Sequence, residues 1–598
     1  MPEWDHTSRE AMNELLPEWN LADLFPGIRS PALQEALAKA ASRAESVAEC
    51  YRGRVGDLSA EQLAELIEKY EGLQDEIGRI MSYAQLVYAA QMNDPSTSQF
   101  FQTTQERCTD ISTNLLFVIL ELNRIEDGKL DGVLESPVLV KYRPWIRDRR
   151  AFRPHQLSDE AEALLHEKHV SGRSAWTRLF DETMAGLEFS FRGESRNSSE
   201  IFDLLSAPDG DVRRDAAEEI SRVLRLNVRA LTLITNTLIK DKEIEDRWRH
   251  FSLPIESRNL ENMVENEVVE TLIKSVKESY PRLSHRYYSI KARWLGLDQL
   301  EYWDRNAPLP EDDDRIITWE DAKKSVLSAY RAFSPKMADI GALFFDNEWI
   351  HARVRSGKTP GAFSHPTVPS VHPYILLNYQ GRTRDVMTLA HELGHGVHQV
   401  LAAGQGALMA ETPLTLAETA SVFGEQLTFR AMLDSEEDAT RRQIMLAGKV
   451  EDMLNTVVRQ IAFCEFESRL HDLRPDGELT SDAIGELWMD VQRESLGPAI
   501  RLHEDYSVYW SYIPHFIHTP FYVYAYAFGD CLVNALYGVY QSSGDDFVEK
   551  YLTMLSSGGA KRHRELLEPF GLDANDPSFW NKGLDVVEGF IVELEQAF

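Results

Sequence analysis

The chain is poor in cysteine and has no long apolar run. Its 598 residues include four cysteines, and none of them forms a Cys-x-x-Cys pair. Such scattered thiols do not suit a disulfide framework and are typical of reduced thiols in a cytosol. The longest apolar run, residues 115–120, is too short to span a bilayer, and residues 1–6 lack the basic start of a signal peptide. We therefore expect a cytoplasmic protein with no membrane partner.

Basic residues are scarce as well. Lys and Arg number 63 against 96 Asp and Glu, which gives a formal net charge of −33. Phosphate binding needs clustered cations, so nucleic acid is not an expected partner. The sequence also has no Gly-x-Ser-x-Gly elbow, no Walker-type loop and no Rossmann fingerprint. The sequence therefore does not indicate an α/β-hydrolase, a P-loop enzyme or a dinucleotide-binding enzyme.

Helical periodicity dominates what is present. Apolar residues recur at a spacing of three to four over residues 33–50, 59–92, 97–124, 211–247, 440–471 and 481–494. Strand-like sequence is sparse and lies chiefly at residues 361–379 and 187–191. These patterns predict a mainly α protein with a small antiparallel β-sheet, large enough to exceed one usual domain.

One short segment carries the chemistry. His391 and His395 are spaced so that, on a helix, both imidazoles leave the same face one turn apart and can bind one metal ion. Glu392 lies about 100° further round, where its carboxylate can hold a metal-bound water instead of the metal. Zinc lowers the pKa of such a water to about 7, and the glutamate can accept its proton. Thr383 is expected to cap this helix, with Asp385 in its first turn.

A catalytic zinc site has three protein ligands and an open position for water. Glu418 is the candidate for the third ligand, because a carboxylate among apolar neighbours is costly to bury without a cation. Glu425 lies seven residues further on, on the same helix face, and could orient a ligand imidazole. The alternative for both glutamates is a charge at the edge of an amphipathic helix.

Several segments together resemble the thimet oligopeptidase family of zinc peptidases, and most closely its bacterial oligoendopeptidase F branch. The zinc motif, residues 391–398, and the segment Ala417-Glu418-Thr419-Ala420-Ser421 carry this likeness. Further matching segments lie at residues 16–21, 357–364, 373–378 and 514–524. The matches follow one another in order over most of the chain.

The resemblance implies a fold and a substrate class. It predicts a gluzincin-type architecture with two helical parts around a deep substrate channel and a small antiparallel sheet beside the zinc helix. An N-terminal helical domain is expected over residues 1–205 and a catalytic domain over residues 206–598. A channel of this kind admits unfolded peptides, so the implied partners are short peptide substrates cut internally.

The resemblance also implies roles for individual residues. It makes His391, His395 and Glu418 the ligands of Zn²⁺ and Glu392 the general base. These are the same residues that the motif itself singles out.

Hydrolysis also needs donors aimed at the oxygen that becomes negative in the tetrahedral intermediate. Relatives use a histidine and a tyrosine about ten residues later, and His515 and Tyr524 match this spacing. Tyr522 is a further candidate, and the choice among Tyr522, Tyr524 and Tyr526 stays open. The alternative for this aromatic stretch is a core helix.

The predicted function is a zinc-dependent endopeptidase that hydrolyses short oligopeptides by attack of a zinc-bound water activated by Glu392. An edge strand at residues 361–364 would align an extended peptide through main-chain hydrogen bonds. The alternative is a zinc carboxypeptidase or dipeptidyl carboxypeptidase on the same scaffold. Such an enzyme grips the substrate C-terminus with a cation that the sequence does not reveal.

Overall fold

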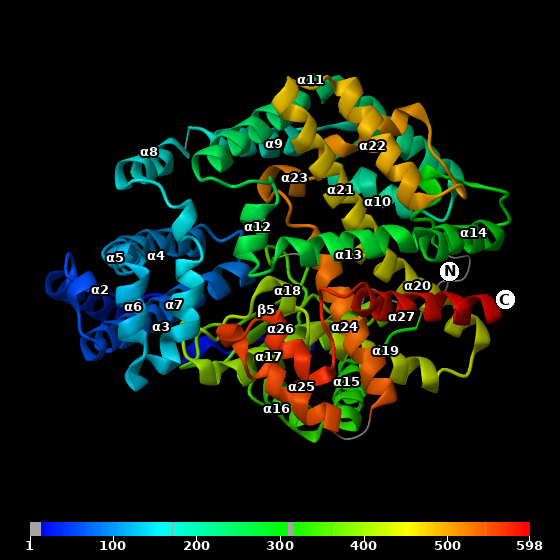
Figure 1. Cartoon of the computed structure of the whole chain (residues 1–598). Helices are drawn as coiled ribbons and strands as arrows, with labels where there is room; N and C mark the ends of the chain where they lie inside the picture. The colour runs from blue at the N-terminus through cyan, green and yellow to red at the C-terminus, as the bar shows by residue number, and fades with distance from the viewer. Residues whose placement is uncertain (1–12, 170, 309–314, 360, 544–545, 598) are drawn as a thin grey trace. The chain divides into compact units, whose positions relative to one another are not determined.

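Helices make up most of the described chain, and its strands are only two or three residues long (Figure 1). The structure is a computed structural model that describes residues 13–597, apart from residues 170, 309–314, 360 and 544–545. The mainly α fold with small sheets predicted from the sequence is confirmed.

The chain folds into two compact units that alternate along the sequence. Unit 1 comprises Met1–Arg153, Asp314–Ser435 and Ser542–Gly571, and unit 2 comprises Pro154–Asp313, Glu436–Gln541 and Leu572–Phe598. The predicted division into residues 1–205 and 206–598 cuts the chain at one point. Each of these units instead combines three separate segments that contact one another. That division stays a prediction.

Unit 1 contains the zinc motif. Its helices are α2 (Pro31–Tyr51), α3 (Ala60–Ala90), α4 (Pro95–Thr113), α5 (Leu116–Arg124), α6 (Asp127–Leu134), α7 (Arg143–Arg150), α15 (Trp319–Phe333), α16 (Pro335–Asp346), α17 (Thr383–Ala402), α18 (Leu414–Ala417), α19 (Ser421–Ser435), α25 (Asp546–Leu555) and α26 (His563–Leu567). The helix expected over residues 97–124 is two helices, because the chain turns at Asn114 and Leu115 before α5 begins.

Capping and one apolar stripe stabilise the N-terminal helices of unit 1. Ser59 caps α3 and exchanges hydrogen bonds with Gln62, so that helix begins where the sequence offers a capping box. Leu63, Leu66 and Ile67 on its inner face are all nearly inaccessible to solvent. They join the core formed with α2 and α4, which pack against α3.

The sheet of unit 1 is mixed and has the order β4-β6-β5. Its strands are β4 (Ile350–His351), β5 (Phe363–His365) and β6 (Tyr374–Leu376). β6 is antiparallel to β5 but parallel to β4, so the expectation of a purely antiparallel sheet is wrong. The chain between β4 and β6 contains β5 and returns to the same end of the sheet, which makes β4 and β6 parallel. β5 is left at an edge.

Unit 2 is built mainly from long helices. They are α8 (Asp159–His169), α9 (Arg173–Ala185), α10 (Ser198–Asp203), α11 (Gly210–Trp248), α12 (Glu256–Glu261), α13 (Asn266–Ser279), α14 (Ser284–Trp294), α20 (Ala439–Thr456), α21 (Val458–Leu473), α22 (Ser481–Leu496), α23 (His515–His518), α24 (Tyr524–Ser542) and α27 (Pro577–Gln596). The helix expected over residues 440–471 breaks at Val457 into α20 and α21, which pack against each other.

Unit 2 also has four short strands. β1 (Phe189–Phe191) lies within the strand predicted at residues 187–191 and forms a hairpin with β2 (Glu194–Arg196), which was not predicted, and β3 (Leu300–Glu301) runs parallel to β7 (Ile500–Arg501). The hairpin turn holds Arg192 and Gly193, both with positive φ.

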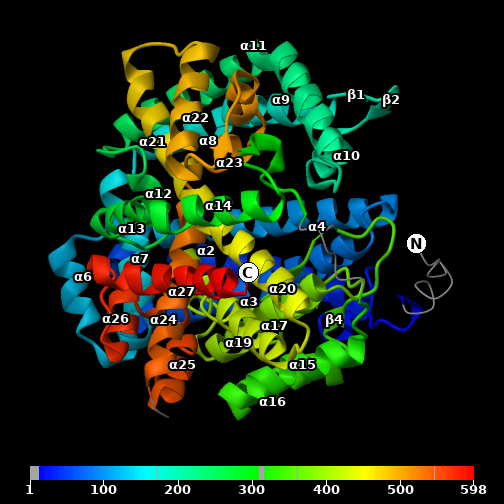
Figure 2. The ribbon, with the colours of Figure 1, turned by 90° about the vertical axis from the view of Figure 1, so that its right-hand side faces the viewer.

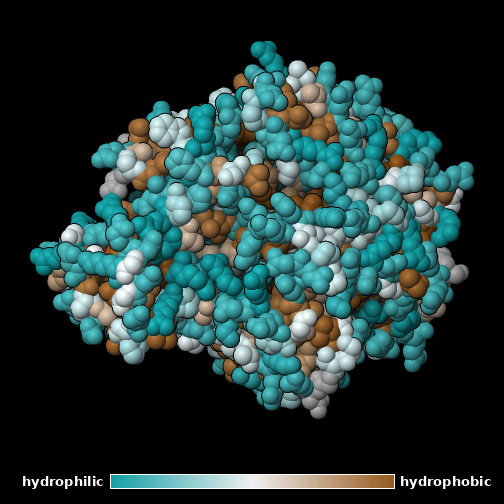
Figure 3. Space-filling model, in the orientation of Figure 1, coloured by the Kyte–Doolittle hydropathy of each residue, from teal (hydrophilic) through white to brown (hydrophobic). Residues whose placement is uncertain are grey.

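The surface is largely polar. The face shown in Figure 3 is mostly hydrophilic, with apolar residues scattered among charged ones. Among the described residues, no helix combines the length and the apolar character needed to cross a membrane.

Candidate active site

The zinc motif lies on α17, the helix that the sequence predicted. Asp385 starts it by accepting hydrogen bonds from the main-chain N–H groups of Gln380 and Arg382, at 2.9 and 3.0 Å. Thr383 is the first helical residue, so the expected threonine cap is wrong and the aspartate two residues later does the capping. α17 packs chiefly against α19 and also against α16, α15 and β5 (Figures 1 and 2).

Glycines let the neighbouring segments approach α17 closely. A Cβ on Gly394 would lie 2.4 Å from the Ala420 carbonyl oxygen and 2.6 Å from the Cα of Ser421. A Cβ on Gly424 would lie 2.2 Å from the Tyr330 hydroxyl, which itself donates to a carbonyl of α17. The glycine inside the zinc motif is therefore what allows the chain around residue 418 to reach the two histidines.

His391, His395 and Glu418 come together at this contact. One ligand atom from each lies within 4.8 Å of the others. Glu418 Oε2 is 3.4 Å from His391 Nε2 and 3.4 Å from His395 Nε2. Two ligands held about 2.05 Å from a tetrahedral zinc lie about 3.3 Å apart. The donor set and its spacing therefore fit a zinc ion with one further position open.

Two other side chains hold these groups in place. Ser421 Oγ donates to Glu418 Oε2 at 2.6 Å, across the turn between α18 and α19 in which Glu418 lies. Glu425 Oε2 lies 3.3 Å from His391 Nδ1, which is the contact expected for a residue that orients an imidazole. Sequence reasoning missed Ser421, because the bond joins two side chains across a turn and matches no capping pattern.

In the protein without metal, neighbouring charges set the titration of these groups. Burial lowers the pKa of His391, but Glu425 and Glu418 outweigh it and raise that pKa to about 9. Burial lowers the pKa of His395 to about 4. Burial raises the pKa of Glu418, but the two histidines outweigh it and lower that pKa. A positive charge on His391 is thus favoured beside the carboxylates of Glu418 and Glu425.

Glu392 lies beside the cluster and is 7% exposed. Burial raises its pKa to about 7, against the opposing effects of the His391 charge and of the Ser364 main chain. A carboxyl group with a pKa near neutrality is suited to accept and return a proton.

The edge strand β5 is fastened to α17. Ile375 in β6 donates its N–H towards β4, so Ser364, opposite Ile375, turns its own N–H and C=O away from the sheet. Gln399 meets this outward side: its Nε2 donates to the Ser364 carbonyl at 3.2 Å, and Ser364 Oγ donates to Gln399 Oε1 at 2.9 Å. No local sequence pattern indicates this clamp, because the two residues come from distant segments.

The loop before β5 is also anchored. Lys358 Nζ donates to the main-chain oxygens of His351 and Arg353 and to the His351 ring, at 2.8 to 3.0 Å. Burial lowers the pKa of His351 to about 3, so its imidazole is neutral and can accept. Asn378 adds two hydrogen bonds to carbonyls of the same loop. Hydrogen bonds therefore hold β5 both through the loop before it and along its outer edge.

His398 is part of the interior of unit 1 and not of the cluster. Its side chain is buried, and its Nε2 lies 3.3 Å from the Thr412 hydroxyl. Burial lowers its pKa to about 4, so it is a neutral core histidine.

Comparison with known proteins decides the family. Residues 203–586 match the profile described as "Peptidase family M3", and residues 121–189 match that of "Oligopeptidase F". The chain belongs to peptidase family M3. It is therefore a metalloendopeptidase, and the resemblance noted in the sequence is confirmed.

Relatives of this M3 peptidase match it along nearly its whole length. Oligopeptidase PepF of Bacillus subtilis is 26% identical over 605 residues, covering 97% of this chain and 88% of PepF. Group B oligopeptidase PepB of Streptococcus agalactiae is 27% identical, covering 97% and 96%. Among solved structures, a peptidase of Chlamydophila abortus superposes with a TM-score of 0.85 at 21% identity, covering 98% of both chains. Oligoendopeptidase-F of Enterococcus faecium gives 0.70 at 22% identity, covering 94% and 98%.

The late aromatic segment of the M3 peptidase lies in unit 2. His515, Tyr522 and Tyr526 are partly exposed and form one group, with ring centroids 5.2 to 6.5 Å apart. Tyr524 is fully buried, and its hydroxyl accepts from Asn262 Nδ2 at 2.8 Å. The structure therefore does not support Tyr524 as a residue that contacts substrate, because its hydroxyl is enclosed and already bonded.

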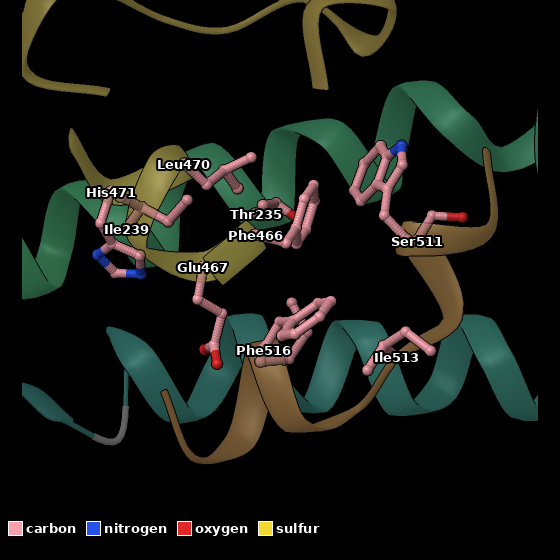
Figure 4. A pocket seen from close by; sticks show the side chains of 11 residues that line it. Thr235, Ile239, Phe466, Glu467, Leu470, His471, Ser511, Ile513 and Phe516 are labelled. Carbon is pink, nitrogen blue, oxygen red and sulfur yellow. The ribbon is translucent and has the colours of Figure 1, made fainter. Parts of the chain in front are cut away.

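A buried carboxyl group holds the start of this segment. Glu467 Oε1 on α21 accepts from the Phe521 N–H at 3.0 Å, and Phe521 has a φ of 60°. Glu467 borders a cavity of about 20 Å³, which also touches His471 and Phe516 (Figure 4) and is large enough for one water molecule. Burial raises the pKa of Glu467 to about 8. A protonated Glu467 thus fixes the main chain one residue before Tyr522.

Proposed function

We propose that this M3 peptidase is a zinc-dependent endopeptidase that hydrolyses short oligopeptides. The observation that carries the proposal is the meeting of three donor atoms within 4.8 Å of one another, with both imidazoles 3.4 Å from Glu418 Oε2 and the buried carboxyl group of Glu392 beside them. The names of the relatives, oligopeptidase PepF and oligopeptidase PepB, support the substrate class.

In this proposal His391, His395 and Glu418 hold the zinc ion. When bound, zinc supplies a Lewis acid that polarises the scissile carbonyl and makes water acidic. Glu425 keeps the His391 ring turned towards the cluster, and Ser421 keeps the Glu418 carboxylate there.

Glu392 acts as the general base and then as the general acid. Its carboxylate takes a proton from the attacking water as the oxygen adds to the peptide carbonyl, and it returns that proton to the leaving amine. The products are a new carboxylate and a new amine, and no other reactant is needed. α17, which carries Glu392, packs against the edge strand β5.

The peptide is aligned by β5. An extended chain can add to the outer edge of this strand through main-chain hydrogen bonds, which depend little on its side chains. Since Gln399 engages the outward carbonyl of Ser364, we assign the first pairing to Ala362, whose main chain faces the same side.

Donors for the developing oxyanion are assigned to His515 and Tyr522, with Tyr526 as their neighbour. The three rings are grouped and partly exposed, whereas Tyr524 is enclosed. The resemblance to oligoendopeptidase F is what connects this group with the substrate. We place the enzyme in the cytoplasm on the four free thiols of the chain.

The test is a digest of a peptide library of mixed lengths by the purified enzyme, with zinc measured on the same preparation. Mass spectrometry of the fragments should show internal cuts in peptides whose C-terminus is blocked. Release of only single residues or dipeptides from free C-termini would instead establish the carboxypeptidase alternative. Absence of cleavage by a zinc-loaded preparation would overturn the proposal.

A further inference from the structure

The residue that precedes β5 lies beyond the end of the β5–β6 ladder. The last pair of that ladder joins Phe363 and Leu376. Leu377, which would lie opposite Ala362, donates its N–H to the His351 carbonyl in β4 at 2.9 Å. The main-chain groups of Ala362 therefore face away from β6, towards the open edge, and the ladder itself does not fix their direction.

Asn378 bonds to this stretch through its side chain. Its Nδ2 donates to the Thr359 carbonyl at 3.0 Å and to the Gly361 carbonyl at 2.9 Å. Carbonyl oxygens accept hydrogen bonds and cannot donate them, so the amide nitrogen of Asn378 faces them and the amide oxygen does not. Asn378 thereby uses both of its N–H groups on one short stretch of chain.

One of these two carbonyls belongs to a part of the chain that other bonds already fix. The Thr359 N–H donates to the Ala89 carbonyl in the last turn of α3 at 2.8 Å. The Gly357 carbonyl accepts from the Met92 N–H, just after α3, at 2.6 Å. The chain before β5 is therefore attached to α3, and Asn378 connects this attached part with the residue that precedes Ala362.

The other carbonyl belongs to a residue whose backbone is free to turn. Gly361 has a φ of 86°, in the left-handed region, and a Cβ at this position would meet no atom within 4 Å. Glycine changes between backbone regions more easily than other residues do. Gly361 directly precedes Ala362, so a rotation at Gly361 also turns the N–H and C=O of Ala362. The hydrogen bond from Asn378 opposes that rotation.

This stretch and the metal cluster belong to the same compact unit. Unit 1 contains α3, the three-stranded sheet and α17, and β5 packs directly against α17 (Figure 1). α17 carries His391, His395 and Glu392. Contacts within one unit therefore place Ala362 relative to these side chains, and a rotation at Gly361 changes that placement.

We propose that Asn378 is a positioning residue for the reaction, which holds the Gly361 carbonyl and thereby orients the main chain of Ala362 towards the peptide substrate. Asn378 acts through Ala362 and takes no part in proton transfer. The inference rests on the proposed function, because it takes Ala362 to be the residue with which the peptide first pairs.

The test compares one internally quenched peptide with a set of esters of the same sequence, all cleaved by the zinc-loaded enzyme. Each ester replaces one backbone N–H, outside the bond that is cut, by an oxygen atom, which removes one hydrogen-bond donor and keeps the length of the chain. Loss of one hydrogen bond corresponds to about a 2- to 12-fold effect. At least one ester should therefore have a kcat/KM lower than that of the parent peptide by this factor, and the most affected one is called the sensitive ester.

Two variants perturb the connection between Asn378 and Ala362. Asn378→Asp keeps the size of the side chain, but its carboxylate cannot donate. It should slow the parent peptide by about 2- to 12-fold and bring the ratio of kcat/KM for the parent peptide and the sensitive ester close to one. Gly361→Ala should have the same effect on the ratio, because alanine does not readily adopt the φ of this residue. Both variants should keep the zinc content of the wild type.

Asn347→Asp is the matched control. Asn347 also donates to a main-chain oxygen, that of Leu343 in α16, and its substitution should leave the ratio unchanged. A residue that only stabilises the fold would lower the unfolding temperature when replaced but would leave the ratio at its wild-type value. If Asn378→Asp does not fold, Gly361→Ala decides the question, because a Cβ at this position would meet no atom within 4 Å.

The possible failures can be told apart. A ratio that stays at its wild-type value in both Asn378→Asp and Gly361→Ala would overturn the inference and leave the proposed function standing. Wild-type enzyme that cleaves every ester as fast as the parent peptide would remove the alignment by β5, and the inference with it, but would leave an endopeptidase. If the zinc-loaded enzyme cleaves no peptide, the proposed function fails and the inference fails with it.

Discussion

The hydrogen bonds between Gln399 and Ser364 are the contact through which α17 holds the edge strand. We expect Gln399→Leu, which keeps the size of the side chain but cannot form hydrogen bonds, to release β5 from the helix that carries the histidines and Glu392. The change should lower peptide turnover without changing the metal ligands.

The magnitude follows from the two bonds, of 2.9 and 3.2 Å. Each partly buried hydrogen bond contributes about 0.5–1.5 kcal/mol net, so Gln399→Leu should cost about 1–3 kcal/mol. This corresponds to a loss of about 5- to 150-fold in kcat/KM. Ser364→Ala removes only the hydroxyl bond and should cost about 2- to 12-fold.

The assay is steady-state cleavage of an internally quenched peptide, with zinc content and thermal unfolding measured on each variant. The double variant Gln399→Leu/Ser364→Ala should be no slower than Gln399→Leu alone, because the hydroxyl bond is already lost. Gln405→Leu is the matched control, since Gln405 also donates to a main-chain oxygen, that of Ser556, away from β5. Turnover by Gln399→Leu within twofold of wild type, or additive losses in the double variant, would refute the role of the clamp.

Three further predictions concern the reaction and the fold. Glu392→Gln should retain zinc but lose about 10²–10⁴-fold in kcat, and more than a tenth of wild-type activity would remove Glu392 as the base. Tyr522→Phe should lower kcat about 10²-fold with little change in KM, whereas Tyr524→Phe should alter thermal stability instead; the reverse pattern would restore Tyr524 as the donor. Glu467 has a folded pKa of about 8 against 4.5 for the ordinary group, so the folded state keeps a proton that the unfolded chain releases between these values. The free energy of unfolding should therefore decrease as pH rises from about 4.5 to about 8, by on the order of 5 kcal/mol, and Glu467→Gln should remove that part of the slope in denaturant titrations at several pH values.

Features that depend on local sequence were predictable. α17 follows from its periodicity, and the meeting of His391 and His395 follows from helix geometry alone. Glu418 and Glu425 could be proposed because a carboxylate between apolar residues needs a partner. Their partners in the structure are the two histidines, as that reasoning requires.

Features that depend on distant segments were not predictable. Which tyrosine is enclosed depends on Asn262, which approaches Tyr524 from a different part of the chain. Helix spacing did not indicate the choice, because Tyr522 lies before the first residue of α24. The break at Val457 likewise has no counterpart in the local sequence pattern.

The central claim is that His391, His395 and Glu418 bind one zinc ion. The most direct measurement is an anomalous difference map at the zinc absorption edge, from crystals of enzyme purified without added metal chelator. We expect one peak per chain, about 2.0–2.2 Å from His391 Nε2, His395 Nε2 and a Glu418 carboxylate oxygen. Active enzyme without a metal peak at these side chains, or with a metal that Glu418 does not contact, would contradict the account.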